Sequence, residues 1–493
     1  MITALRRHWV AILLGAGAAL GHAPWSLWPL TILCFIGFFW WNGDASVRGK
    51  RAQFQRFWFF GFVYFAVSMS WIIEPFLVDA AAHGWMAPFA LVFMAGGLAV
   101  FWGLAGLAHP YGGAFASASA LGVAEWMRGH VLTGFPWGMP AYGVVDTGFI
   151  QWFAILGPYG VTIALFLISA LIAVALRARK FGWIAAATCA GAIAVALPLL
   201  RAERTDAASD YVVRLIQPNA QQSQKWDPQY APIFYKRLLD ATADGARPDL
   251  IIWPESAIAA LLNYAPDMIA DIEQAAGETP VAFGALRFDD AEQLKNALVL
   301  LQAGAEMQIY DKSHLVPFGE YLPLESFLRP LGLGFFYELF GGAFTPGPAP
   351  RVLELYDGKR FLPLICYELI FPNLVRGTNE RPDFIVQITN DAWFGTVSGP
   401  YQHLAQARAR AVENGVPVVR VANTGVSAVI APDGLVTAHL PLDQFGVLNA
   451  YLPVAEKPTV YARLGDIFVP IFCLIGILLA WIERRKKNLL TFL

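Results

Sequence analysis

The chain has 493 residues, which is enough for two or three domains. Hydrophobic residues make up 57% and charged residues only 15%, less charge than a typical soluble protein carries. The net charge of -2 leaves no basic surplus to neutralise phosphates, which argues against nucleic acid as a partner. Residues 1–205 contain few charges and residues 206–460 contain most of them. This asymmetry indicates a membrane part followed by a globular part.

Apolar runs occur at both ends of the chain. A helix needs about 17–25 apolar residues to cross a bilayer. Candidate spans lie near residues 8–22, 26–42, 57–73, 86–107, 113–127, 160–176, 182–200 and 467–482. The first is not followed by a signal-peptidase site, so we interpret it as an anchor. We therefore expect a membrane domain of seven transmembrane helices over 1–205, a globular domain over 206–460, and an eighth helix with a basic tail over 461–493.

Basic residues predict the orientation of these spans. Four clusters flank them: Arg6 and Arg7; Arg48, Lys50, Arg51 and Arg56; Arg177, Arg179 and Lys180; and Arg484, Arg485, Lys486 and Lys487. All four fall on one side of the membrane if there are eight spans with both termini inside. The globular segment then lies on the outer face.

The fifth candidate span contains a charge. Glu125 lies beside Trp126 and close to Arg128. A carboxylate there belongs either to the membrane interface or to a polar path through the bilayer. We favour the interface.

Residues 206–460 alternate between strand and helix signals. Strands are predicted at 211–217, 249–253, 281–288, 297–302, 308–312, 361–366, 384–389, 416–422 and 428–431, and helices at 230–244, 266–276 and 401–414. Many of the strands are apolar on both faces, which is typical of strands buried between layers. The segment is therefore predicted to be a layered α/β domain.

Three of the predicted strands end in residues that can carry out acyl chemistry. The strand at 361–366 ends at Cys366, and the strands at 249–253 and 308–312 lead to Glu255 and Lys312. A thiolate attacks carbonyls, and Glu255 could accept the thiol proton. The Lys312 cation would favour the thiolate and stabilise the oxyanion, with the backbone N–H of Tyr367 as a second donor.

Each of these residues also has an ordinary explanation. Cys366 could be a small buried hydrophobe, Glu255 a charge at a helix N-terminus, and Lys312 a surface residue at a strand end. His314 suggests a Cys–His pair, but no acidic partner for it can be assigned. The eight histidines lack metal-ligand spacing, so we expect neither a metal nor a cofactor.

The segment 322–348 is apolar and contains several glycines. Long apolar loops are uncommon in compact domains. It is either a buried Ω-loop or a mobile arm that enters lipid or covers an acyl chain, with glycines as hinges. We favour the arm.

Three short segments carry a resemblance to a known superfamily. They are Trp253-Pro254-Glu255-Ser256, the run from Tyr310 to Tyr321, and Ile365-Cys366-Tyr367-Glu368. These resemble the Glu–Lys–Cys motifs of the nitrilase superfamily. With the apolar spans, and with the segments 217–219, 225–228 and 389–395, the chain resembles the membrane-fused branch of that superfamily, the apolipoprotein N-acyltransferases.

The resemblance implies a multi-span helical membrane domain and a four-layer α-β-β-α sandwich on the periplasmic face of a bacterial inner membrane. It implies Cys366 as nucleophile, Glu255 as general base and Lys312 as oxyanion stabiliser. Four further residues match positions that support the family's active site: Glu320, Trp226, Tyr367 and Glu368.

The reaction implied by the resemblance has two steps and two lipid partners. An acyl chain passes from a membrane phospholipid to Cys366 as a thioester, and then to the free amine of S-diacylglyceryl-cysteine in an apolipoprotein. Covalent catalysis of this kind divides one difficult transfer into two easier ones. The alternatives are a membrane-tethered amidase and a non-catalytic protein that binds lipoproteins.

Overall fold

The computed structural model describes residues 2–43, 49–180, 182, 191, 208–331, 344–378 and 380–491. The chain divides into two compact units. The helical unit comprises Met1–Arg204, Val397–Ala405 and Pro458–Leu493, and the sheet unit comprises Thr205–Thr396 and Gln406–Lys457. Each unit is described separately below.

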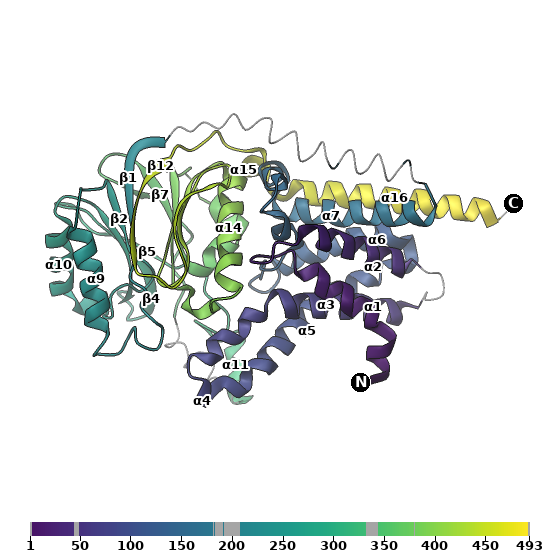
Figure 1. The fold of residues 1–493 in the computed structure, drawn as a ribbon, viewed down its shortest axis with the longest axis horizontal. Coiled ribbons are helices and arrows are strands. Elements are labelled where there is room, and N and C mark those ends of the chain that lie inside the picture. Colours follow the sequence, from purple (N-terminus) through teal and green to yellow (C-terminus); the bar gives the residue numbers. More distant parts are fainter. Residues whose placement is uncertain are drawn as a thin grey trace. The chain divides into compact units, whose positions relative to one another are not determined.

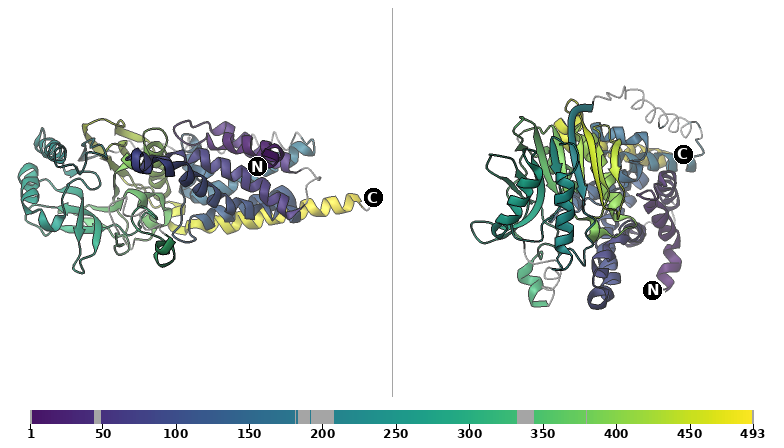
Figure 2. Two further views of the ribbon diagram at one scale, coloured as in Figure 1. Left: turned by 90° about the horizontal axis from the view of Figure 1, so that it is seen from below. Right: turned by 60° about the vertical axis from the view of Figure 1, so that its left-hand side comes forward.

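The helical unit is a bundle formed from both ends of the sequence. α3 packs along α5, and the C-terminal helix α16 (yellow in Figure 1) packs against α6 and α7, as Figure 2 also shows. Its helices are α1 (Ile2–Ala19), α2 (Trp28–Asn42), α3 (Lys50–Ser68), α4 (Ala80–His83), α5 (Ala87–Gly106), α6 (His109–Arg128), α7 (Phe153–Arg177), α15 (Val460–Leu464) and α16 (Phe468–Thr491). The 3₁₀ turns are η1 (Ser70–Leu77), η2 (Gly84–Met86), η3 (Pro140–Val144), η4 (Gly148–Trp152) and η9 (Gly465–Ile467).

The apolar helices of this unit fit a membrane protein. Within the described residues, three helical stretches are long and apolar enough to cross a bilayer: Ala80–Gly106, Gly148–Arg177 and Val460–Arg485. A fourth is added if Lys50–Ser68 and Ser70–Leu77, bent by 48°, form one span. His8–Ala19 and Trp28–Asn42 are shorter apolar helices. The predicted span at 182–200 lies outside the described residues except for 182 and 191.

Glu125 lies near the end of α6, as an interface residue would, but its side chain points into the bundle. It is 0% exposed and forms an ion pair with Arg128 at 2.6 Å. The indole N–H of Trp102 donates to the same carboxylate at 2.7 Å. Arg128 also donates to the carbonyls of Phe135 and Trp137. The charge is therefore part of an internal polar network that holds the loop after α6.

The sheet unit contains two six-stranded sheets. Their orders are β12-β1-β2-β3-β4-β5 and β11-β10-β9-β8-β7-β6. The first sheet has β1 (Ala208–Gln217), β2 (Leu250–Ile252), β3 (Val281–Phe288), β4 (Leu294–Leu301), β5 (Gln308–Asp311) and β12 (Gly446–Pro453). The second has β6 (Leu353–Glu354), β7 (Arg360–Ile365), β8 (Phe384–Thr389), β9 (Val418–Ala422), β10 (Ser427–Ile430) and β11 (Val436–Leu440).

The two sheets pack face to face, and helices cover their outer faces. Alternate residues of β1 face the other sheet, so that Val213 and Leu215 share a buried core with Phe361 and Ile365 of β7. Residues of the opposite parity, such as Ile216, pack under the helices α9 (Ala231–Ala243) and α10 (Pro266–Ala276). The Gln406–Asn414 part of α14 (Gly399–Asn414) lies on the other side (Figure 1), and a further short helix, α13 (Pro372–Arg376), follows β7 in the chain. The predicted four-layer α-β-β-α sandwich is thus confirmed.

The individual strand predictions are also confirmed. All nine predicted strands and all three predicted helices are present, with ends within three residues of those expected. Three strands were not predicted: β6, β11 and β12. The remaining short elements are α11 (Glu325–Leu328), η5 (Leu262–Tyr264), η6 (Arg329–Leu331), η7 (Cys366–Ile370) and η8 (Asp391–Phe394). Residues 332–343 of the apolar segment 322–348 lie outside the described residues, as do the contacts on which the predicted arm depends.

Candidate active site

The strands that carry the predicted reactive residues end at one edge of their sheets. β1, β2 and β3 are parallel, and two antiparallel pairings bring β5 back into the direction of β3. In the second sheet, β7, β8 and β9 are parallel. Carboxyl ends of parallel strands are where open α/β sheets usually bind ligands. Glu255, Lys312 and Cys366 follow β2, β5 and β7 respectively.

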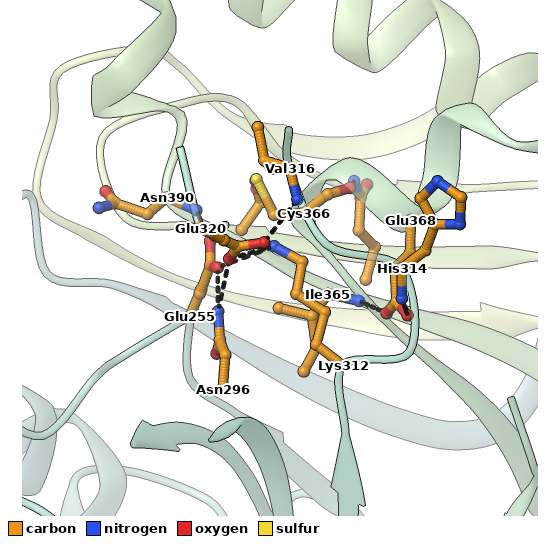
Figure 3. A network of polar contacts seen from close by, with 12 residues as sticks. Glu255, Asn296, Lys312, His314, Val316, Glu320, Ile365, Cys366, Glu368 and Asn390 are labelled. Carbon is orange, nitrogen blue, oxygen red and sulfur yellow. Dashed lines mark hydrogen bonds and ion pairs between the residues drawn. The ribbon is translucent and has the colours of Figure 1, made fainter. Parts of the chain in front are cut away.

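Lys312 lies between two carboxylates (Figure 3). Its Nζ is 2.8 Å from Oε1 of Glu320 and 3.7 Å from Oε1 of Glu255, and the residue is only 1% exposed. Burial alone lowers the pKa of Lys312, but the charges of Glu320 and Glu255 outweigh it and raise the pKa above its ordinary value. Lys312 is therefore a permanent cation at neutral pH.

The carboxylate of Glu255 is oriented from two sides. Its Oε1 accepts a hydrogen bond from Nδ2 of Asn296 at 2.8 Å, and its Oε2 accepts one from the backbone N–H of Asn390 at 2.8 Å. Asn296 lies on β4 and Asn390 follows β8, so both sheets hold this one side chain. A carboxylate fixed in this way is well placed to accept and return a proton.

Glu320 connects Lys312 to the loop that follows it. While Oε1 of Glu320 accepts from Lys312, Oε2 accepts from the backbone N–H of Val316 at 2.8 Å. Asn296 also reaches Glu320 Oε1, at 3.4 Å. The structure thus brings Glu255, Lys312 and Glu320 into one buried cluster.

Cys366 occupies a sharp turn immediately after β7. It is the first residue of η7 and has φ 51°, in the left-handed region that side chains other than glycine rarely adopt. Its carbonyl accepts from Nε2 of Gln387 at 3.3 Å. Strain of about 1–3 kcal/mol is typical of such conformations, and it is retained where the turn must present a side chain.

The electrostatics of Cys366 favour the protonated thiol. Burial is the main reason why the pKa of Cys366 is raised above its ordinary value, and the charges of Glu255 and Asp391 act in the same direction. Lys312 and a hydrogen bond with Thr389 lower the pKa, as expected for the cation, but do not outweigh burial. A thiol with a raised pKa is mostly protonated at neutral pH, so its attack on a carbonyl would require a proton acceptor.

A buried polar network lies beneath the turn. Arg420 of β9 donates to Asp391 and, at 2.6 Å, to Oε1 of Gln387. Thr389 donates to Asp391 at 2.8 Å. Since Gln387 in turn donates to the Cys366 carbonyl, this network connects the middle of the second sheet to the turn that carries Cys366.

Glu368 has a different environment from the other carboxylates. It accepts five hydrogen bonds: from the Tyr310 hydroxyl, from the backbone and side chain of Ser313, and from the backbone of His314 and Ile365. In Figure 3 it lies apart from the cluster of Glu255, Lys312 and Glu320. Burial raises the pKa of Glu368 in spite of these bonds. Its contacts join the ends of β5 and β7, which is a structural role.

The remaining predicted residues lie at the margin of the cluster. Tyr367 is buried, with its ring beside those of His314 and Phe371. The His314 ring packs on Phe371 with centroids 4.0 Å apart. Trp226 is 45% exposed, and within the described part of the chain no hydrogen bond joins it to the cluster.

Sequence reasoning missed several residues of this site. Asn296 and Asn390 orient Glu255, and Lys225 donates from Nζ to the Glu255 carbonyl at 2.9 Å. Lys225 and Asn390 lie within segments that resemble the family, and Asn390 directly follows a predicted strand, but its amide side chain has no reactive chemistry that would single it out. Only their placement in the fold shows that they meet at Glu255.

Comparison with known proteins identifies the family. Residues 14–171 match the model "Apolipoprotein N-acyltransferase N-terminal domain", and residues 213–456 match "Carbon-nitrogen hydrolase". An apolipoprotein N-acyltransferase of Bradyrhizobium diazoefficiens is 36% identical, over 98% of this chain and 96% of its own length. The chain belongs to the apolipoprotein N-acyltransferase family. The Caulobacter vibrioides member is 37% identical over 97% of this chain and 95% of its own length.

Several solved structures that resemble this chain each cover about half of it. An amidase from Nesterenkonia sp. is 20% identical with a TM-score of 0.36, over 53% of this chain and 93% of its own. The resemblance of the sequence to the apolipoprotein N-acyltransferases is confirmed by the relatives and by both family models.

Among the described residues, no group of three or more His, Cys, Asp or Glu side chains could hold a metal ion.

Proposed function

We propose that this protein transfers an acyl chain from a membrane phospholipid to the free N-terminal amine of S-diacylglyceryl-cysteine in apolipoproteins, giving triacylated lipoprotein. The observation that carries this proposal is the buried cluster of Glu255, Lys312 and Glu320 at the strand ends beside Cys366. It supplies a nucleophile, a base and a cation in a chain related to apolipoprotein N-acyltransferases over nearly its whole length.

In the first half-reaction, the Cys366 sulfur attacks the ester carbonyl of the phospholipid while Glu255 accepts the thiol proton. The oxyanion that forms is stabilised by the Lys312 ammonium and the backbone N–H of Tyr367. Collapse breaks the ester C–O bond, and Glu255 returns its proton to the leaving oxygen. The lysophospholipid departs, and the acyl chain remains on Cys366 as a thioester.

In the second half-reaction, the neutral amine of the acceptor attacks the thioester carbonyl. Glu255 accepts a proton from the attacking nitrogen, the C–S bond breaks, and the proton returns to the Cys366 sulfur. A thioester donates acyl groups to amines more readily than an oxygen ester does. The raised pKa of Cys366 keeps the thiol protonated between turnovers.

We further propose that the sheet unit faces the periplasm from a bacterial inner membrane crossed by eight helices, seven of them before residue 205. The four basic clusters support the orientation. The long apolar helices support membrane insertion. With both substrates amphiphilic, a membrane-anchored site lets their acyl chains remain in lipid while the reacting groups reach Cys366.

The decisive experiment is mass spectrometry of the purified full-length enzyme after mixing with phospholipid. We expect an added acyl mass on the Cys366 peptide that hydroxylamine removes and that a diacylated lipopeptide with a free amine discharges. Cys366→Ala should give no adduct and no triacylated product, whereas Cys473→Ala in α16 should behave as wild type. Discharge by water alone would indicate a hydrolase. Equal lipopeptide acylation by Cys366→Ala would exclude the thioester route.

A further inference from the structure

The turn between β1 and α9 delivers one more charged side chain to the site. Asn423 fixes this turn by accepting from the backbone of Asn219 and Ala220 and donating to the Ala220 carbonyl. The Oε1 of Gln222 accepts from the side chain of Asn390 at 2.7 Å. Asn390 is the residue whose backbone N–H orients Glu255. Asn390 therefore both holds this turn, through its side chain, and orients Glu255, through its backbone N–H.

Lys225 projects from this turn into the protein. It is 6% exposed, and its Nζ donates to the backbone carbonyl of Glu255 at 2.9 Å. Among the described residues, no carboxylate forms an ion pair with Lys225, whereas Lys312 has two such partners. A buried ammonium without a paired carboxylate is costly, so few proteins retain one that serves only packing.

The charge of Lys225 is coupled to the reactive groups. Burial lowers the pKa of Lys225 to about 8, and the charges of Glu255 and ionised Cys366 act in the opposite direction. Coupling between two titrating groups is mutual, so a charged Lys225 favours the Cys366 thiolate. The negative charge of ionised Cys366 raises the pKa of both Lys225 and Lys312.

We propose that Lys225 is a positioning residue of the acyl-transfer site. It fixes the backbone of the base Glu255 through that residue's carbonyl, and it supplies a second buried positive charge that favours negative charge on Cys366 as the thiol loses its proton. This inference rests on the proposed function for its role in turnover. Its electrostatic part concerns the thiol alone and can be tested without substrate.

The test follows alkylation of Cys366 by iodoacetamide in the full-length enzyme across pH, read on the Cys366 peptide by mass spectrometry. Besides Lys225, the groups that act on the pKa of this thiol are Glu255, Lys312, Asp391 and Thr389, and all are unchanged in the variants. Lys225→Met and Lys225→Gln each remove the charge, so either suffices if the other fails to fold. Lys225→Arg retains it. Lys236→Met, at an exposed pair with Asp240 on α9, is the matched control.

We expect Lys225→Met and Lys225→Gln to alkylate about ten-fold more slowly at pH 7.5, corresponding to a pKa about one unit higher. Thioester formation should slow by a similar factor with little change in KM, while Lys225→Arg and Lys236→Met remain close to wild type. An unchanged alkylation profile in the neutral variants would overturn the proposal, even with lower thermal stability. A shifted profile in an enzyme whose wild type forms no acyl adduct would support Lys225 and overturn the proposed function instead.

Discussion

At Cys366, burial and two neighbouring carboxylates oppose the thiolate that acyl transfer requires. Glu255, the proton acceptor of the proposed mechanism, is oriented by Asn296 and Asn390 and contacted by two buried lysines, Lys225 and Lys312. Moving the proton from Cys366 to Glu255 leaves the total charge of the cluster unchanged. A buried site tolerates such a transfer better than the loss of a proton to water, because no new net charge is buried.

The raised pKa of Cys366 has a measurable consequence. Alkylation reports the thiolate fraction, so its rate should continue to rise with pH above about 9.5, where an ordinary cysteine with a pKa of about 8.5 approaches full ionisation. The folded state also binds this proton more tightly than the unfolded chain does. The stability that this binding contributes should therefore decline as pH rises above the unfolded pKa. A plateau in the alkylation rate at or below about pH 9.5 would contradict the expected direction.

Glu320→Gln separates the charge of Glu320 from its backbone contact. The amide oxygen can still accept from Val316, but Lys312 loses one of its two carboxylates. We expect alkylation of Cys366 at pH 7.5 to become faster, because the Lys312 charge is less compensated. Acyl transfer should fall by about 10²-fold, because Lys312 is no longer held in place. If Glu320→Gln changed the alkylation rate and the acyl-transfer rate in the same direction relative to the wild type, the two expected effects would be contradicted.

The matched control for this substitution is Glu325→Gln. Glu325 pairs with Arg329 at 3.2 Å on an exposed helix, so its loss should change stability by less than about 1 kcal/mol and leave both rates unchanged.

At the scale of elements, strand β3 supports the turn that carries Glu255. A Cβ on Gly284 would lie 2.5 Å from the backbone nitrogen of Ser256 and 2.6 Å from Cα of Glu255. Backbone atoms cannot move aside as the end of a side chain can. We expect Gly284→Ala to destabilise the protein by about 1–3 kcal/mol and to reduce acyl transfer at least about ten-fold.

Thermal unfolding and adduct formation measure these two effects of Gly284→Ala. Gly49→Ala is the control, since Gly49 has φ -73° and no atom lies within 4 Å of its added Cβ. Wild-type adduct formation in Gly284→Ala would show that Glu255 does not depend on this contact.

Most of the sheet unit could be predicted because its strands are buried on both faces. β8 and β9 are buried at every position, so most of their residues are apolar and only Gln387, Thr389 and Arg420 interrupt the pattern. β11 and β12 alternate between half-buried and exposed residues, and β6 has only two residues. Polar residues such as His439 and Asn449 interrupt the apolar pattern there. These edge strands are defined by pairing with neighbours, which a single sequence does not reveal.

The reactive residues could be predicted because they stand directly at strand ends. Lys225 lies in a loop, Asn390 directly follows β8 but has no reactive side chain, and Asn296 stands beside Lys295 in the part of β4 that precedes the predicted strand. Asn296 and Asn390 contact Glu255 from positions 41 and 135 residues away in the sequence, so only the folded chain brings them together. Glu368 was predicted to lie near the reactive groups, and its contacts place it at the ends of β5 and β7, while its role there stays a prediction.

At the scale of the whole molecule, the proposed orientation can be tested by labelling. Ala305→Cys lies in the exposed turn between β4 and β5, and Arg484→Cys lies on the exposed side of α16. In cells with a permeabilised outer membrane, a membrane-impermeant maleimide should label Ala305→Cys and leave Arg484→Cys unlabelled. Both should react after lysis. Labelling of Arg484→Cys alone in unlysed cells would reverse the orientation.

The contacts of Glu368 have a consequence for how the sheet unit opens. Its carboxylate accepts hydrogen bonds from the backbone N–H groups of Ser313 and His314, which follow β5 of one sheet, and of Ile365, which ends β7 of the other. If any one of these N–H groups opened to water, the buried carboxylate of Glu368 would lose a hydrogen bond while it remained bound to the other two. In heavy water these amides should therefore exchange with one common rate, set by a single cooperative opening of both sheets. Glu368→Gln should divide that rate into separate, faster ones.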